Sequence, residues 1–512
     1  MATVMAVGAL AGMLTPGAVG ATASAAGSGG NLMVLANSGS FTWRSLDPAT
    51  GTGFLAYPWY MNAIYGELFQ QGPKNKPIPD LATGYSISKD GKTVTIRLRH
   101  GVKFTDGTPF NAAAVKFNID RDLSPASADA CGCALNYPIK TITTPDQYTV
   151  VLHMKTVFAP IIQAFFNDVA NWIASPTALQ KMGVKQFSIT PVGAGPFMVK
   201  SDKVGAQLQL VKNPNYWQKG FPKLNSLTFG TIGSDESAFE ALQAGQTQVI
   251  QSLGTATIAQ QAATAGFRVK QTGVSNNNPS GVQFNTTVAP FNNIKAREAI
   301  YYATDPQPIN KALLLGKGTL TQTMTGPASL FFEPKVPGYR TYNLAKAKAL
   351  VQQLGGLKFS LLTNMTPTNV NIITALKAEW AKAGIQTTLN PQVLGNYINL
   401  EMHNQWQIAL QGVGGLDPAI GFGLSFRFET NGPFTGVKNP NLDKLINAGV
   451  VELNPEKRLA IYKQAYKLVS DQAYIAMLFT IPTFNISAKK VSGPGLSTSN
   501  DAEILWQDVT MK

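Results

Sequence analysis

The chain has 512 residues, of which 44% are hydrophobic and only 14% are charged. This composition excludes a coiled coil, a collagen-like fibre and a highly charged disordered chain, and the length is enough for several domains. The net charge is +14, but no run of Lys and Arg exceeds two residues. A nucleic-acid-binding protein usually gathers its basic residues on one face or in runs, so no nucleic-acid partner is expected.

The N-terminal region has the pattern of an export signal. No charged residue precedes Arg44, Val4–Leu14 is apolar, and small residues follow at Ala21–Ala25. A disordered Ala/Gly leader is the alternative. We predict that residues 1–30 are leader and linker and that the protein works in the periplasm or at the extracellular face of the membrane. In such a compartment Cys131 and Cys133 predict a local structural disulfide rather than a redox pair.

Elements of both kinds follow in the first half of the chain. The stretch Leu32–Leu35 is strand-like, and Thr93–Arg99 alternates apolar and polar residues as a half-buried strand does. The turn Asp106–Pro109 precedes a predicted helix at Phe110–Arg121. Further on, the pattern predicts a strand at Leu208–Lys212 and a helix at Ser234–Ala244.

The second half begins after a polar, turn-rich run at Gly273–Gly281, which we interpret as a crossing between domains. The pattern beyond this crossing predicts helices at 294–303, 344–354 and 370–383, strands at 358–362 and 386–389, and a long helix starting at Asn454-Pro455. The chain is therefore expected to be an α/β protein of two lobes, each with its own sheet.

Catalytic and metal-binding motifs are largely missing from the sequence. His100, His153 and His403 do not pair at helical spacing, and neither a GxSxG elbow nor a GxxxxGK[ST] loop occurs, so no metal, cofactor or catalytic residue is predicted. Ser86-Ile87-Ser88-Lys89 matches S-x-x-K, but it precedes a turn rather than opening a helix. A secreted hydrolase using Ser86 and Lys89, or an unrecognised pair of acids, remains the alternative to a binding protein.

An ordered series of short motifs is similar to one family. The series comprises Leu46-Asp47-Pro48, the block Leu98–Phe110 (LRHGVKFTDGTPF), Pro191–Phe197 (PVGAGPF), Asn213–Trp217 (NPNYW), Phe284-Asn285, Ala296–Ile300 (AREAI) and Asp417-Pro418. It resembles the family 5 extracellular solute-binding proteins, the peptide/nickel-type receptors of ABC importers, which include dipeptide- and oligopeptide-binding proteins. The resemblance covers nearly all of residues 31–512. Within the motifs, Gly193 and Gly195 are expected to adopt backbone torsions that other residues avoid.

The resemblance implies a two-lobed fold of the periplasmic-binding-protein type (type II, cluster C) with an extra subdomain in lobe one. By that resemblance lobe one comprises residues 31–275 and the return 483–512, with the subdomain at 56–189, and lobe two comprises 276–482. It also implies a monomeric, non-enzymatic receptor that closes on a peptide or related polar solute and delivers it to an ABC permease. A non-transport sensor on the same fold is a further alternative.

The sequence departs from the dipeptide branch of this family at two positions. The acid that pairs the ligand's amino group in that branch falls on Gly414, and the stretch Leu362–Met365, where the resemblance places an Arg for the ligand carboxylate, contains none. Because a buried charged terminus without a partner costs several kcal/mol, a neutral, polar or larger ligand is expected.

The candidate ligand-binding residues follow from the same alignment. They are Trp43 and Ser45 beside the first Leu-Asp-Pro, the lobe-two residues Asn285, Gly414, Gly415 and Asp417, and the aromatic residues Tyr65 and Trp406. Aromatic residues such as the last two are more often core than ligand contacts. Asp417 has a second interpretation as the cap of a turn.

Overall fold

The computed structural model describes residues 29–37, 43, 45–50, 57–124, 137–166, 169–272, 279–414, 417–420, 423–430, 432, 434, 436–497 and 504–512. The predicted leader up to residue 28, the predicted disulfide between Cys131 and Cys133, and the candidate site residue Gly415 lie outside the described residues. No helix among the described residues is long and apolar enough to cross a membrane.

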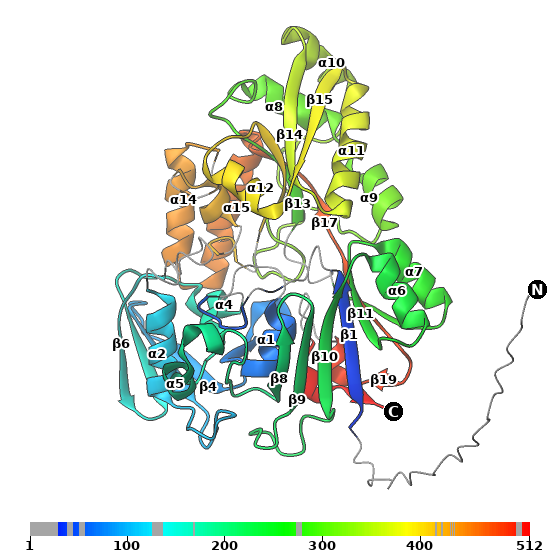
Figure 1. Cartoon of the computed structure of the whole chain (residues 1–512). Helices are drawn as coiled ribbons and strands as arrows, with labels where there is room; N and C mark the ends of the chain where they lie inside the picture. The colour runs from blue at the N-terminus through cyan, green and yellow to red at the C-terminus, as the bar shows by residue number, and fades with distance from the viewer. Residues whose placement is uncertain are drawn as a thin grey trace, which may run out of the picture.

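Lobe one is built on a sheet in which the described strands have the order β12-β18-β11-β1-β10-β9-β8. Its central strand β1 pairs in parallel with both β10 and β11. Side chains of α1 pack with β1 and β10 in one core, and Leu35 of β1 packs with α6 and α7 in another. Both faces of the sheet are therefore covered (Figure 1). The elements are β1 (Asn31–Asn37), α1 (Tyr57–Tyr65), β8 (Phe197–Lys203), β9 (Gln207–Lys212), β10 (Ser226–Ile232), α6 (Asp235–Gln243), β11 (Val249–Leu253), α7 (Ala256–Thr264), β12 (Arg268–Gln271), β18 (Thr483–Ser487), β19 (Val491–Ser492), β20 (Thr510–Met511) and the 3-10 helices η3 (Pro494–Ser497) and η4 (Trp506–Asp508).

A subdomain with a separate core is attached to lobe one. Its described strands form an antiparallel sheet in the order β4-β5-β7-β6, and its apolar core includes Val94, Ile96, Phe104 and Phe165. Its elements are β2 (Phe69–Gln71), η1 (Pro73–Asn75), β3 (Pro77–Pro79), β4 (Ala82–Ile87), β5 (Thr93–Leu98), α2 (Ala112–Asp122), β6 (Ile139–Asp146), β7 (Thr149–Met154), α4 (Ile161–Phe165), η2 (Val169–Asn171) and α5 (Pro176–Phe187).

Two glycines of the motif Pro191–Phe197 pack directly on α1. A Cβ atom on Gly193 would lie 2.4 Å from the Ile64 carbonyl oxygen, and one on Gly195 would lie 2.6 Å from the Ile64 carbonyl carbon. Neither glycine is among the described residues with a positive φ. The expectation of unusual torsions at these glycines is therefore wrong, and close approach of two backbones is the reason for the missing side chains.

Lobe two has its own sheet, in which the described strands have the order β15-β14-β16-β13-β17. Phe359 and Leu361 of β14 pack with Trp380 of α11 in the main core of this lobe. The elements are β13 (Pro279–Phe284), α8 (Ile294–Ala303), α9 (Pro306–Leu314), α10 (Leu344–Gln353), β14 (Leu357–Asn364), α11 (Pro367–Ala381), β15 (Ile385–Gln392), α12 (Leu394–Met402), β16 (Ile408–Gly412), α13 (Leu424–Phe428), α14 (Pro440–Val451), α15 (Pro455–Asp471) and β17 (Ile475–Thr480).

The chain passes between the lobes twice, after β12 and after β17. The lobes also touch at both flanks. On one side the Ala159 amide of the subdomain donates to the Val450 carbonyl of α14 at 2.8 Å, and on the other the Gln271 side chain donates to the Lys317 carbonyl at 3.1 Å. In Figure 1, α14 and α15 accordingly reach down to the subdomain. The interlobe region is thus framed by two crossings and two flanking contacts.

Candidate functional site

The ends of the central strands of both sheets point toward the interlobe region. In lobe one β1 and β10 run in parallel and end together, with Asn37 paired to Ile232. In lobe two β14, β15 and β16 are parallel, and Gly412 at the end of β16 pairs with Ser280 beside the crossing. In open α/β sheets ligands bind outside the carboxyl ends of the strands. The segments that follow these strands are therefore the candidate site.

The first Leu-Asp-Pro segment, Leu46–Pro48, is fixed to lobe one by a buried ion pair. The Asp47 carboxylate is fully buried and accepts two hydrogen bonds from the Arg121 guanidinium of α2, at 2.7 and 2.5 Å. The Tyr65 hydroxyl donates to the Leu46 carbonyl at 2.9 Å, and burial together with the nearby Asp47 charge raises the pKa of Tyr65. Tyr65, a candidate ligand contact, is therefore fully engaged in holding this segment.

Ser45 takes part in the same arrangement. Its hydroxyl accepts a hydrogen bond from the Asp47 amide at 3.1 Å and lies 2.9 Å from the Thr50 hydroxyl. The Leu46 amide donates to the Ser188 carbonyl at 2.8 Å. Residues 45–50 thus form a rigid turn beside the interlobe region. The Ser45 hydroxyl and the Asp47 amide are hydrogen-bonded within this turn.

Asp417-Pro418, from the second Leu-Asp-Pro motif, is fixed to lobe two in the same way. The buried Asp417 carboxylate pairs with the Arg458 guanidinium of α15 at 2.6 Å and accepts a hydrogen bond from the Tyr462 hydroxyl at 3.1 Å. It also accepts one from the Ala419 amide at 3.0 Å. Burial and the Asp417 charge raise the pKa of Tyr462. Asp417 therefore caps its turn and neutralises Arg458.

The two lobes thus hold an Asp-Pro pair, Asp47-Pro48 and Asp417-Pro418, by the same kind of contact. In each case a fully buried aspartate pairs with an arginine on a helix, and a tyrosine hydroxyl donates to the segment. Breaking such a buried pair by removing one partner costs about 3–5 kcal/mol, so both segments are held firmly in place. We call these the twin anchors: Asp47–Arg121–Tyr65 and Asp417–Arg458–Tyr462.

Gly414, just before the second anchor, has a backbone that disfavours a side chain. Its φ is +117°, in the region that L residues rarely adopt. This torsion explains why the chain has glycine where the dipeptide branch of the family has an acid: an aspartate at position 414 would be strained.

Trp43 lies in lobe one beneath the interlobe region. Its indole nitrogen donates to an Asp202 carboxylate oxygen at 2.9 Å, and its ring lies 5.4 Å from that of Tyr60. Burial raises the pKa of Asp202. Trp43 also lines a void of about 20 Å³ together with Tyr60 and Phe229. This void is close to the smallest that holds one water, so in this conformation Trp43 offers no room for a larger group.

Asn285 and Trp406 are brought together with each other but not with the twin anchors. Asn285 follows β13 at the end opposite the crossing, and it is fully buried. Its amide donates to the Trp406 carbonyl at 2.9 Å and to the Asn404 side chain at 2.7 Å. The structure thus places this pair at the far end of the lobe-two sheet.

A buried polar network that the sequence did not reveal supports the end of β16. Arg427 of α13 pairs with Glu401 of α12 at 3.2 Å, and Glu401 also accepts a hydrogen bond from the Gln411 side chain. The Tyr397 hydroxyl donates to Gln411 at 2.7 Å, and burial raises the pKa of Glu401. The signal available in the sequence was the spacing of Tyr397 and Glu401 by four residues, which places both on one face of α12.

Exposed apolar side chains occupy the ends of β14 and β15. Met365, Val393 and Leu394 are 51%, 61% and 44% exposed. The Met365 amide donates to the Gln392 carbonyl at 2.9 Å, so the two strand ends are adjacent. Met365 ends the stretch Leu362–Met365, in which the sequence lacks an arginine, and Val393 and Leu394 lie beside it. We call these three residues the apolar rim.

The tetrapeptide Ser86-Ile87-Ser88-Lys89, which matches S-x-x-K, starts on β4. Ser86 lies exposed on β4, and the hydroxyl of Ser88 in the same tetrapeptide donates to Asp90 at 2.6 Å. No group of His, Cys, Asp and Glu that could hold a metal ion occurs within the described ranges.

Comparison with known proteins decides the family. The model of the bacterial extracellular solute-binding proteins, family 5 (middle region), matches residues 76–432. The chain belongs to this family. The family 5 chain is 32% identical over 327 residues to the glutathione-binding protein GsiB of Escherichia coli strain K12. That alignment covers 63% of the chain and 61% of GsiB, so the chain spans about three fifths of the length of the curated relatives it matches.

Solved structures share the fold of this family 5 chain. DppA of Helicobacter pylori in complex with the peptide STSA aligns with a TM-score of 0.79 at 23% identity, covering 94% of the chain and 98% of DppA. The dipeptide-binding protein of Pseudoalteromonas sp. SM9913 in complex with Met-Leu aligns with a TM-score of 0.80 at 21% identity, covering 94% of the chain and all of that protein. The two-lobed α/β fold of the type II binding proteins expected from the sequence is confirmed.

Proposed function

We propose that this protein is an exported receptor that captures a peptide or related polar solute between its lobes and delivers it to the permease of an ABC importer. The observation on which this proposal rests is the pair of twin anchors, one in each lobe, which fix matching segments beside the interlobe region. Family membership supports the proposal. So do a relative named as a glutathione-binding protein and two solved structures that hold the peptides STSA and Met-Leu.

The proposed mechanism is closure of a hinge. The two crossings form the hinge, and in the described part of the chain the Ala159–Val450 and Gln271–Lys317 hydrogen bonds join the lobes at the flanks. A ligand shifts an open–closed equilibrium only by its difference in affinity for the two states, and about 5.5 kcal/mol moves it from 1:99 to 99:1. A micromolar ligand has about 8 kcal/mol in total, which is enough. The ligand leaves unchanged, so the protein is a receptor and not an enzyme.

The ligand end that meets lobe two is proposed to be uncharged. Asp417 is already neutralised by Arg458, and Met365 of the apolar rim ends the stretch where the resemblance places an arginine for a carboxylate. A free ammonium or carboxylate buried there would lack a partner, at a cost of several kcal/mol. A blocked or longer peptide, a glycan or a peptide-like metabolite satisfies this constraint.

The ligand-contacting residues in this proposal come from the segments at the interlobe region. Ser45, Gly414 and the backbone beside Asp417 are proposed to line it, Trp43 to support it from below, and Tyr65 to act through Leu46; the predicted contact Gly415 lies outside the described residues. We keep the predicted lobe limits, with lobe one at 31–275 and 483–512 and lobe two at 276–482. The subdomain, predicted at 56–189, is proposed to start after α1, because the side chains of α1 pack in the lobe-one core. The protein acts as a monomer outside the cytoplasm.

The test is a melting-temperature screen of the purified protein with matched ligands. Each peptide of a short series, and glutathione, is offered with free termini and with an acetylated N-terminus and amidated C-terminus. A ligand at a hundred times its Kd adds about 2.7 kcal/mol of stability. We expect the blocked forms to stabilise more than the free forms, with the ligand recovered intact. Failure of every ligand at millimolar concentration, or turnover of the bound ligand, would contradict the proposal.

A further inference from the structure

A second cavity lies in lobe two, away from the interlobe region. Its volume is about 330 Å³, and it is lined by Val288, Ala289, Ser360, Leu362, Asn390, Asn404, Gln405, Trp406 and Gln407. This volume is near the lower end of the range of about 300–1,000 Å³ found for small-molecule sites.

The position of this cavity separates it from the proposed ligand cleft. Ser360 precedes the interlobe end of β14 by four residues, which at about 3.3 Å per residue is roughly 13 Å. Ser360 and Leu362 lie on the opposite face of the sheet from Phe359 and Leu361, which pack on α11. Leu362 instead packs with Trp406 and Tyr397 on the α12 side.

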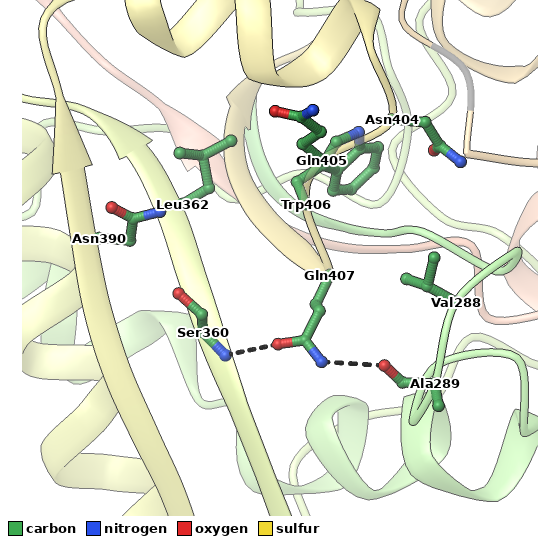
Figure 2. Close-up of a pocket in the computed structure, with 9 residues that line it drawn as sticks. All are labelled: Val288, Ala289, Ser360, Leu362, Asn390, Asn404, Gln405, Trp406 and Gln407. Atoms are coloured by element: carbon green, nitrogen blue, oxygen red, sulfur yellow. Dashed lines mark hydrogen bonds between the residues drawn. The ribbon is translucent and has the colours of Figure 1, made fainter.

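The wall of the cavity is rigid. The Gln407 side chain accepts a hydrogen bond from the Ser360 amide and donates one to the Ala289 carbonyl, both at 2.9 Å, and so ties β14 to the turn at 288–289 (Figure 2). The Asn404 side chain is held by Asn285 at 2.7 Å and donates to the Thr287 hydroxyl at 3.0 Å. The side-chain amides of Gln407 and Asn404 therefore hold the cavity wall together and are not available to a ligand.

Other polar groups at the cavity have no protein partner among the described residues. They are the Ser360 hydroxyl, the side-chain nitrogen of Asn390 and the side-chain amide of Gln405, a residue that is exposed to solvent. The indole nitrogen of Trp406, a residue only 5% exposed, is also buried without a partner in the described structure. Figure 2 shows Ser360, Leu362 and Asn390 on two neighbouring strands, facing Gln407 and Trp406.

The chemistry of the lining selects an uncharged ligand. None of the nine lining residues is charged, so an ammonium or a carboxylate bound here would lose hydration without gaining an opposite charge. Free donors outnumber free acceptors, which favours a ligand with several neutral oxygens. Leu362 and Val288 supply an apolar floor for its carbon skeleton.

We propose that this cavity is a second binding site, specific for a neutral monosaccharide, and independent of the solute bound between the lobes. A single hexose carries hydroxyl oxygens around an apolar ring face. It is also small enough to fit a cavity of about 330 Å³.

The test titrates the full-length protein with glucose, galactose, mannose and N-acetylglucosamine, and with the charged analogues glucuronate and glucosamine, by saturation-transfer NMR and calorimetry. We expect saturable binding of at least one neutral sugar and at least tenfold weaker binding of its charged analogue. Ser360→Leu, which fills the cavity, is expected to abolish sugar binding. Thr388→Leu, an exposed β15 residue paired with Ser360 but outside the lining, should retain it.

A milder variant separates loss of sugar binding from loss of folding. Gln405→Ala removes an exposed amide and should weaken the sugar about fivefold, the effect of one hydrogen bond of about 1 kcal/mol. Gln386→Ala, an exposed residue of β15 outside the lining, should have no effect. A protein that binds none of the neutral sugars would overturn the proposal, as would sugar binding that Ser360→Leu and Gln405→Ala leave unchanged. Stabilisation by interlobe peptides should persist in both variants, so the two proposals fail separately.

Discussion

Removal of Arg458 is the sharpest perturbation of the twin anchors. Arg458 and Asp417 are 5% and 1% exposed in their side chains, so Arg458→Met leaves a carboxylate buried without a counter-charge. Loss of one partner of such a pair costs about 3–5 kcal/mol. Arg458 also donates to the Gly449 carbonyl at 3.0 Å, so this cost includes the link between α15 and α14.

A matched control lies on the same helix. Lys467 pairs with Asp471 at 2.8 Å, but both side chains are about half exposed. Exposed pairs of this kind contribute about 0.2–1 kcal/mol, so Lys467→Met should cost less than 1 kcal/mol. Both variants replace a long cationic side chain of α15 with the same residue.

Two measurements compare the stability of the Arg458→Met and Lys467→Met variants. Urea unfolding followed by circular dichroism gives the difference between the two variants, and hydrogen exchange reports opening of residues 417–420. We expect Arg458→Met to lose at least 2 kcal/mol more than Lys467→Met and to speed exchange in this segment. The double variant Asp417→Asn/Arg458→Met should recover part of the loss, because the unpaired charge is gone. Equal losses in the two single variants, with unchanged exchange, would refute the anchoring role.

Three further predictions concern other parts of the molecule. Gly414→Asp should destabilise the protein by about 1–2 kcal/mol because of its positive φ, whereas Gly412→Asp, where a Cβ meets open space, should cost much less by the same urea titration. Met365→Arg should raise the affinity for peptides with a free carboxylate about tenfold over their amidated forms in calorimetry, an effect of about 1.4 kcal/mol; equal affinities would argue against the position of the apolar rim. Burial raises the pKa of Glu379 from its ordinary value of 4.5 to about 7, so the folded state favours the protonated acid. The stability that this acid gives is present below pH 4.5 and is lost as the pH rises through 7, and Glu379→Gln should remove that part of the pH dependence of the melting temperature.

Much of the fold was predictable because local patterns decide it. The helix expected at 294–303 has those bounds as α8, and the helix expected from Asn454-Pro455 is α15, with the Asn454 side chain accepting from the Glu456 and Lys457 amides. Capping residues and periodic apolar positions are properties of a few adjacent residues, so they can be seen in the sequence alone.

The candidate site was harder to predict because it depends on distant partners. Nothing near Asp417 in the sequence indicates that Arg458 neutralises it, and Glu401 and Arg427 meet only once α12 and α13 have packed. Asn285 was expected to face the cleft because of its place in the family motif Phe284-Asn285. The intervening β13 takes it to the other end of the sheet, where it supports Trp406 and the second cavity.

The central claim is that the lobes close around a solute, and small-angle X-ray scattering tests it most directly. The radius of gyration should fall when the free protein is saturated with a ligand that raises its melting temperature. Thr272 and residues 480–483, which lie beside the two crossings, should change their hydrogen exchange at the same time. An unchanged radius with a bound, stabilising ligand would contradict the account.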